Sequence, residues 1–295
     1  MVRAMYSGVS GLRSHQSKMD VIGNNIANVN TYSFKASRAA FQDVFYQTLQ
    51  GSSNPGDNYG GSNAMQVGYG SKISSIDMLF TNSGFAPTDY PLDCMINGNG
   101  FFMVGPAGCT DVSQMKMTRV GMFGIDAAGN LVDAGGNFVY GYSSVRDGND
   151  MPDLDNPTYN TTNLVPLKVP QDATGNPIEL SGISIGADGT LSGINSGGNV
   201  VCVGKISVAN VPNPQGLTQD GSSYFTIREN TGVVTHNIAG EGTTGKIQSG
   251  GLEMSNVDLS KEFTDMITTQ RGFQANSRII TVSDEMLQEL VNLKR

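Results

Sequence analysis

The two ends of the chain constrain its fold more than any other feature, because each repeats apolar residues at the spacing of one helix face. In the N-terminal segment, steps of four and three residues reach eight positions, of which five are apolar. These five are Met5, Val9, Leu12, Met19 and Ile26. The pattern predicts an amphipathic helix over residues 2–29. Glycines and serines make one side of this helix small enough for a second backbone to approach, although a plain core helix has the same periodicity.

The C-terminal segment carries the longer stripe. Ser255 to Asp258 has the spacing of a capping box and predicts a helix start. Ten heptad-spaced positions follow: Leu259, Phe263, Met266, Gln270, Phe273, Ser277, Ile280, Asp284, Leu287 and Val291. The three polar members, Gln270, Ser277 and Asp284, recur every seven residues. Such a strip either fixes the register of a coiled coil or faces water or a channel, and both alternatives remain open.

Neither terminal helix is stable alone, because isolated helices are marginal in water. We therefore expect the two helices to pack on each other, on the middle of the chain, or on other subunits. The middle reads differently: from about Met65 to Gly251, short β-type runs alternate with turns rich in glycine and asparagine. These features predict an α+β protein with a mainly β central region, a sandwich or an irregular barrel. Residues 147–177, rich in Asp, Asn, Pro and Thr, predict a long surface loop.

Charge is distributed unevenly and excludes some partners. Residues 1–40 carry five basic groups and one acidic group, whereas residues 41–253 carry 8 basic and 19 acidic groups. An acidic middle argues against nucleic acid, which requires a basic surface. No segment has the length of a membrane span or the features of a cleavable export signal. Three scattered cysteines do not form a disulfide framework.

Catalytic and metal-binding motifs are not found in the sequence. The two histidines, His15 and His236, belong to no cluster with metal-ligand spacing. The acidic run at 147–155 does not match an EF-hand, so a solvated loop is favoured over a calcium site. We expect no cofactor, no metal and no enzyme activity. A β-rich polysaccharide enzyme is the alternative from another class, but the aromatic residues that such sites recruit are sparse, and tryptophan is absent.

Two terminal motifs resemble the subunits of the bacterial flagellar rod and hook. The first is ANVNTYSFK, in which Ser33 stands where the family usually has glycine. Its family-matching residues are Ala27, Asn28, Val29, Asn30, Thr31, Phe34 and Lys35. The second is the C-terminal run from SNVDL to NLKR, and the stretch from QVGYG to GNGFFMV is similar to the region that leads into the outer domain. The resemblance covers about half of the chain.

This resemblance implies a three-part architecture. Residues 1–29 and 255–295 would pair as an inner coiled-coil domain, residues 30–85 and 240–254 would form a linking domain, and residues 86–239 would form the outer β domain. The apolar positions above, together with Gln270, Ser277 and Asp284, would then form the seam within and between subunits.

The resemblance also implies a function. Within the family the likeness favours a hook subunit, a universal joint in a helical homopolymer, with a distal rod subunit as the alternative. Its expected neighbours are rod, hook-cap and hook-filament junction proteins. The expected location is the hook of the basal body, outside the cell, reached through the type III flagellar export apparatus without a cleavable signal.

Overall fold

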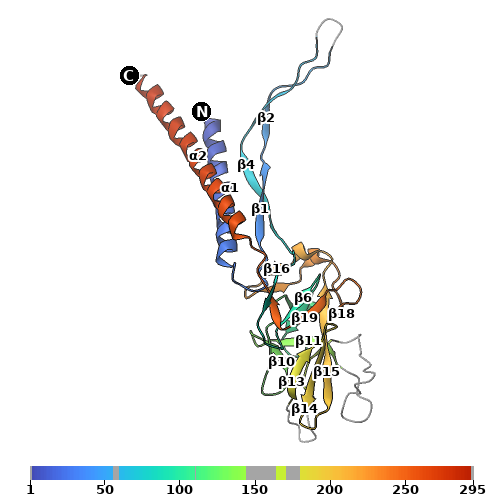
Figure 1. Ribbon diagram of the computed structural model, residues 1–295. Helices are drawn as coiled ribbons and strands as arrows, with labels where there is room; N and C mark the ends of the chain where they lie inside the picture. The colour runs from blue at the N-terminus through green and yellow to red at the C-terminus, as the bar shows by residue number, and fades with distance from the viewer. Residues whose placement is uncertain (1, 56–59, 110, 144–163, 171–179, 294–295) are drawn as a thin grey trace. The chain divides into compact units, whose positions relative to one another are not determined.

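The computed structural model describes residues 2–55, 60–109, 111–143, 164–170 and 180–293 (Figure 1). By their internal contacts, the residues divide into two compact units. Unit 1 comprises Met1–Val29, Lys35–Leu79 and Val257–Arg295, and unit 2 comprises Asn30–Phe34 and Phe80–Asn256. Each unit is described by itself.

Unit 1 combines two helices with a long β hairpin. Helices α1 (Val2–Ala27) and α2 (Leu259–Asn292) lie side by side, as Figure 1 shows. Strand β1 (Ser37–Asp43) pairs antiparallel with β4 (Ser71–Met78), and β2 (Tyr46–Gln50) pairs antiparallel with β3 (Met65–Gly68). Helix α1 contacts α2 as well as β1 and β4. It is therefore the central element of this unit.

The start of α2 differs from the sequence prediction. The N-cap is Asp258, whose carboxylate accepts hydrogen bonds from the backbone N–H groups of Ser260 and Lys261. Ser255 was expected to cap the helix, but its backbone carbonyl instead accepts a hydrogen bond from the Ser83 hydroxyl. An aspartate at the N-cap satisfies free N–H groups and places a negative charge at the positive end of the helix dipole.

Unit 2 is built almost entirely of antiparallel strands. Those outside the largest sheet are β5 (Phe85–Pro87), β6 (Cys94–Asn97), β19 (Lys246–Ser249) and β20 (Gly251–Glu253). The 12-stranded sheet contains β7 (Phe101–Gly105), β8 (Lys116–Thr118), β9 (Phe123–Ile125), β10 (Leu131–Asp133), β11 (Phe138–Ser143), β12 (Val165–Pro166), β13 (Leu180–Ile185), β14 (Thr190–Asn195), β15 (Val200–Asn210), β16 (Thr218–Gln219), β17 (Tyr224–Thr226) and β18 (Thr235–Ile238). Three 3-10 turns accompany it, at Val112–Gln114, Pro214–Gly216 and Glu229–Thr231.

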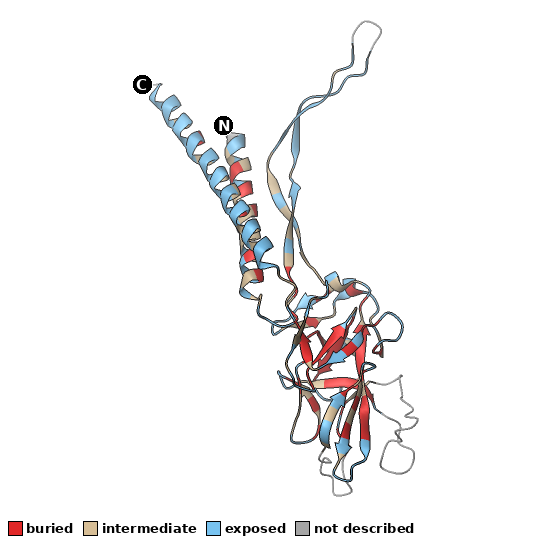
Figure 2. Ribbon diagram, viewed as in Figure 1, coloured by how far each residue is buried: buried red, intermediate tan, exposed pale blue. Residues whose placement is uncertain are grey.

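The large sheet is curled, because β15, β11 and β7 pair with one another in all three combinations. Its concave side holds the core of unit 2, where Phe102, Val104 and Ile206 are fully buried. Figure 2 shows buried residues concentrated in these strands, whereas most of α2 is exposed. The two smaller ladders, β6 with β19 and β5 with β20, tie the end of unit 2 to its beginning.

The predicted fold class is confirmed: the terminal helices are in contact, and the middle is mainly β. The short β-type runs predicted between about Met65 and Gly251 are confirmed, because strands recur throughout the described part of this range. Strands β1 and β2 were not predicted. Most of the loop predicted at 147–177, and the whole acidic run at 147–155, lie outside the described residues.

Candidate assembly interface

The contact between α1 and α2 is made largely by small side chains. A Cβ atom added to Gly8 would lie 3.3 Å from Cγ1 of Ile280, and one added to Gly11 would lie 2.7 Å from Nδ2 of Asn276. On the opposite helix, a Cβ added to Gly272 would lie 2.7 Å from Cε1 of His15. The helices therefore approach so closely that glycine is required at several points. Gly23 does not take part, because nothing lies within 4 Å of a Cβ added there.

A buried asparagine joins three elements of unit 1. Nδ2 of Asn25 donates to the carbonyl of Ser37 at 2.8 Å and to Oε1 of Glu262 at 3.2 Å, and its Oδ1 accepts from the Ser37 N–H at 3.0 Å. Asn25 is 1% exposed. Because one side chain satisfies groups on α1, β1 and α2 at once, it fixes the mutual position of these elements.

The imidazole of His15 lies at the same contact. Its ring centroid is 5.7 Å from that of Phe41, and Lys18 reaches Asp265 on α2 at 3.8 Å. Burial, followed by the charge of Lys18, lowers the pKa of His15. This shift favours the neutral form of the imidazole, which suits its place in a packed helix contact.

The seam residues predicted on α1 lie beside the contact rather than at its centre. Met5, Leu12, Met19 and Ile26 are half-buried, and Val9 is exposed. The fully buried positions are Gly8, Gly11, Ser14, Ile22 and Asn25.

On α2 the predicted stripe is displaced from the observed contact by about one residue. Met266, Ile280 and Leu287 are half-buried. The other seven positions are exposed: Leu259, Phe263, Gln270, Phe273, Ser277, Asp284 and Val291. The residues that are buried are Thr269 and Ser283, each one position before a predicted polar member. Because mainly small side chains fit where α2 approaches α1 closely, most of the bulky apolar residues of α2 lie outside this contact.

Those outside residues form two stripes on α2. The N-terminal stripe is Leu259, Phe263 and Ile267, spaced four residues apart. The C-terminal stripe is Ile279, Val282, Met286, Leu290 and Leu293, which are 44%, 50%, 45%, 51% and 81% exposed. Spacings of three and four place each set on one helix face. The C-terminal stripe was missed from sequence, although its spacing of three and four was visible there.

The recurring polar strip faces away from α1. Gln270, Ser277 and Asp284 are all exposed, and the carboxylate of Asp284 accepts a hydrogen bond from Gln288 at 3.1 Å. None of the three therefore sets the register of the α1–α2 pair. A position facing a channel, or a contact to another subunit, remains a prediction.

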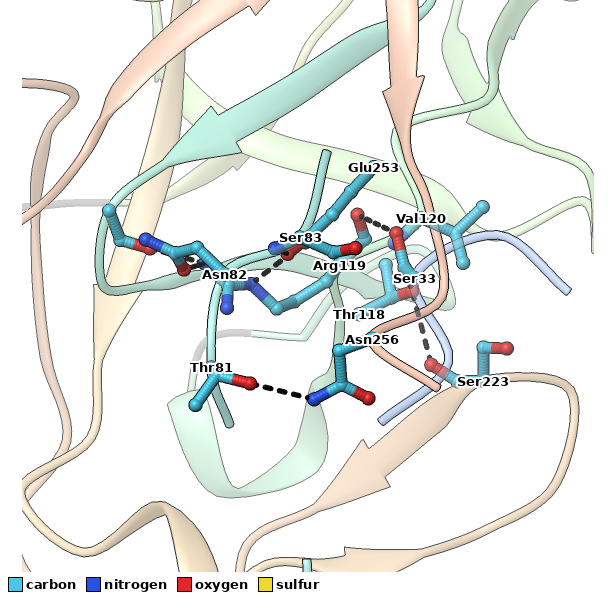
Figure 3. A network of polar contacts seen from close by, with 11 residues as sticks. Ser33, Thr81, Asn82, Ser83, Thr118, Arg119, Val120, Ser223, Glu253 and Asn256 are labelled. Carbon is cyan, nitrogen blue, oxygen red and sulfur yellow. Dashed lines mark hydrogen bonds and ion pairs between the residues drawn. The ribbon is translucent and has the colours of Figure 1, made fainter. Parts of the chain in front are cut away.

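The family motif reaches into a buried polar network of unit 2 (Figure 3). The Ser33 hydroxyl donates to the carbonyl of Arg119 at 2.9 Å, and the Ser33 N–H donates to the carbonyl of Glu253 at 2.8 Å. Ser33 has a φ of 56°, in the left-handed region where glycine is favoured, which accounts for the glycine that the family usually has here. The serine compensates through its buried hydroxyl bond.

Arg119 and Glu253 form the charged centre of this network. They are 3% and 0% exposed, with Nε of Arg119 at 3.5 Å from Oε2 of Glu253, an ion pair rather than a hydrogen bond. The guanidinium also donates to Asn82 Oδ1 at 3.2 Å and to the carbonyl of Gly98. Burial lowers the pKa of Arg119, and the charge of Glu253 opposes that shift. The pair therefore stabilises the loop that carries the family motif, residues 27–35.

The remaining motif residues cap the helix and turn the chain. Nδ2 of Asn28 donates to the carbonyl of Asn24 at 2.9 Å, at the end of α1. The Phe34 N–H donates to the carbonyl of Thr31 at 3.3 Å. Lys35 is buried, and Ala27 and Asn30 are exposed. Val29 is half-buried.

Other chemistry is not evident within the described ranges. No group of three or more His, Cys, Asp or Glu residues there has the arrangement of a metal site. Cys94, Cys109 and Cys202 are buried and form no disulfide, and burial raises the pKa of the Cys94 thiol. In the described part of the chain, neither helix is long and apolar enough to span a membrane.

Close-packed terminal helices, exposed apolar stripes and a β-rich middle are the features of a structural subunit. Three family models match: "Flagella basal body rod protein" at residues 5–35, "Flagellar hook protein FlgE/F/G D1 domain" at 95–193, and "Flagellar basal body rod FlgEFG protein C-terminal" at 248–293.

Full-length relatives agree with these models. The chain is 42% identical over 296 residues to the flagellar basal-body rod protein FlgG of Bacillus subtilis (strain 168), with all of both chains covered. It is 32% identical over 298 residues to the FlgG of Borreliella burgdorferi, and 29% identical over 446 residues to the flagellar hook protein FlgE of the same organism, again with full coverage. The chain belongs to the flagellar rod and hook family of axial proteins. It is a structural subunit and not an enzyme, so the polysaccharide-enzyme alternative is not supported.

Proposed function

We propose that this chain is a subunit of the distal part of the flagellar rod, the stiff shaft of the basal body, rather than of the hook. The observation that carries the proposal is the match to rod relatives along the whole chain without a difference in length. The Bacillus subtilis rod protein aligns over 296 residues with this chain of 295. The two hook relatives align over 446 and 469 positions, so roughly 150 or more of those positions are gaps in this chain.

The hook function expected from the sequence is therefore the less supported of the two readings. Two of the short phrases that favoured it, QRGFQANSRII and EMLQELVNLKR, lie in and directly after α2, almost entirely within the region matched by a model common to rod and hook proteins. The third phrase, SGFAPTDYPLD at residues 83–93, lies outside the regions that the three family models match. The discriminating information is the overall length, which matches the rod relatives and not the hook relatives. A likeness confined to shared helices cannot separate the members of one family.

The proposed architecture in the polymer has three parts. The helices, residues 1–29 and 255–295, would form an inner domain around the central channel, residues 30–85 and 240–254 a linking domain, and residues 86–239 an outer domain. Two hydrogen bonds support the second assignment, because the backbone N–H groups of Ser33 and Ser83 both donate to Glu253 and so join residues 30–85 to residues 240–254. The subunits would assemble as a helical homopolymer, since contacts between unlike surfaces that do not close into a ring generate filaments.

The partners and location follow from the same proposal. A distal rod subunit joins other rod subunits on one side and hook subunits on the other. It would travel through the type III flagellar export apparatus. Transmission of torque without bending requires firm contacts along the shaft, and the exposed apolar stripes of α2 supply surface for such contacts.

The proposal is tested by deleting the gene and isolating basal bodies for electron microscopy. A distal rod subunit lies between the motor and the hook, so its loss should remove the hook together with the outer part of the rod. Restoring the chain should restore both. If the deletion strain instead keeps a full-length rod and lacks only the hook, the hook function is correct and the rod proposal is wrong.

A further inference from the structure

We propose that the C-terminal stripe of α2 from one copy of this chain seats in a groove between α1 and β4 of the next copy. The inference rests on the proposed assembly into a homopolymer and identifies the two surfaces that meet. The first observation is the groove itself, a hollow of about 430 Å³ within unit 1. Its lining includes Tyr6, Val9 and Arg13 of α1, together with Val44, Lys72 and Ile73 of the hairpin.

The groove combines an apolar floor with two cations. Tyr6 and Val9 are 65% and 38% exposed, although both belong to a helix that is otherwise packed on two sides. Arg13 and Lys72 are exposed, and neither forms an ion pair within the part of the chain that the structure describes. A partner that fits must therefore present apolar side chains next to negative charge.

The C-terminal stripe has this composition. Its five apolar residues are all more than two-fifths exposed. Glu285 and Glu289 lie one turn apart on the face next to the stripe and are exposed. The exposed cation Arg278, four residues before Val282, borders the same stripe, so this face carries two carboxylates and one guanidinium. Its net negative charge complements the basic groove.

The two surfaces also agree in length. The α1 residues that line the groove run from Tyr6 to Ser17, which spans roughly 17 Å at 1.5 Å per residue. The stripe runs from Ile279 to Leu293, which spans roughly 21 Å. A helix of this length can lie along the groove over most of its extent.

The occupant has to come from another copy. The α2 helix of the same chain covers the Gly8–Gly11 side of α1. Arg13 follows Gly11 by two residues, about 200° around the helix, so the groove opens on the opposite side. Repeating this contact from copy to copy joins unlike surfaces and builds an open filament.

The competing occupant on the same helix is the N-terminal stripe of a second copy. The side chains next to Leu259, Phe263 and Ile267 include the cation Arg271, which follows Ile267 by four residues. This charge would face Arg13 and Lys72 unfavourably. The C-terminal stripe is therefore favoured, and the N-terminal stripe becomes an outcome of the test.

Cross-linking within assembled polymer tests the pairing directly. Flagellated cells would produce two full-length variants together, Val9→Cys and Met286→Cys, and the isolated polymer would be oxidised and run on a denaturing gel. We expect disulfide-linked dimers, and a ladder of multimers when one chain carries both substitutions. The three native cysteines are buried, so the unsubstituted chain provides the background. The matched control replaces Met286→Cys by Phe263→Cys, which should give no dimers.

Two results would overturn the proposal: dimers formed by Val9→Cys with Phe263→Cys but not with Met286→Cys, or assembled polymer without any dimers. Both results can be measured in a rod or in a hook polymer. They are therefore distinct from a failure of the rod proposal, which would be seen in the position and shape of the polymer.

Charge reversal gives an independent measurement. Arg13→Glu should reduce the amount of assembled polymer by about tenfold, and Glu289→Arg in the same chain should recover most of it. Arg13 is exposed, so the fold should survive the substitution, which circular dichroism of the purified variant would verify. Normal assembly of Arg13→Glu, or no recovery in the double variant, contradicts the proposed contact.

Discussion

Removal of the buried guanidinium of unit 2 should strongly destabilise the loop that carries the family motif. In Arg119→Met, the side-chain volume and the aliphatic stem are largely kept, including the position over the ring of Phe101, whose centroid is 5.7 Å from the guanidinium carbon. The charge is lost. Glu253, which is 0% exposed, would then lose its contact with the buried guanidinium.

The size of the effect follows from the contacts. Breaking a buried ion pair by removing one partner typically costs about 3–5 kcal/mol. The oxygens of Asn82 and Gly98 also lose their donor, at about 1–3 kcal/mol for each group left unsatisfied. Relaxation and entering water offset part of this cost, so we expect a loss of about 4 kcal/mol. This is a large part of the 5–15 kcal/mol that stabilises a typical domain.

Urea unfolding of the purified chain, followed by far-UV circular dichroism, measures this loss in the transition of the β-rich unit. The matched control is the double variant Arg119→Met with Glu253→Gln, which also removes the buried negative charge of the carboxylate. Its loss should be about 2 kcal/mol smaller than that of the single variant. A loss below about 1 kcal/mol in the single variant, or no recovery in the double variant, would refute the reasoning.

Three further predictions concern the motif and the helices. Ser33→Gly should change the free energy of unfolding by less than about 1 kcal/mol, because glycine adopts the left-handed backbone without strain. Ser33→Ala should cost about 1 kcal/mol more, since alanine loses the hydroxyl bond and keeps the strain. Equal values in urea unfolding would contradict this. Gly23→Ala should stabilise assembled polymer against heat by about 1 kcal/mol per subunit, whereas Gly11→Ala should not, because its Cβ meets α2; the same melting shift for both would be the contrary result. Phe273→Asp should abolish sedimentable polymer and leave unit 2 folded, and normal sedimentation would exclude this residue from a subunit contact.

The sequence predicted the helices well but not their contact faces. A heptad count follows the bulkiest apolar residues, and it led to Phe263, Phe273 and Val291 on α2. These residues are exposed. Of the predicted positions, Ile280 does contact α1, but the rest of the contact runs through Thr269, Gly272 and Asn276, to which hydropathy assigns no weight. A helix that has partners on several sides carries several stripes, and periodicity alone does not say which stripe belongs to which partner.

In the middle of the chain, too, structure set by local sequence was predictable, and contacts between residues far apart in sequence were not. Strands such as β7 and β15 were predictable, because β-branched and aromatic residues stand between glycine turns. Strands β1 and β2 were not predicted, since residues 37–50 have exposed side chains on both faces and little alternation. The Arg119–Glu253 pair joins residues far apart in sequence, so no local sequence pattern predicts it.

The most direct test of the account is the shape of the polymer that this chain forms, seen by electron microscopy of the purified assembly. A distal rod built on the close-packed helices of unit 1 should appear as a straight, rigid tube. A hook should appear as a curved, flexible one. Tubes that stay straight under flow agree with the rod proposal. Tubes that are uniformly supercoiled contradict it.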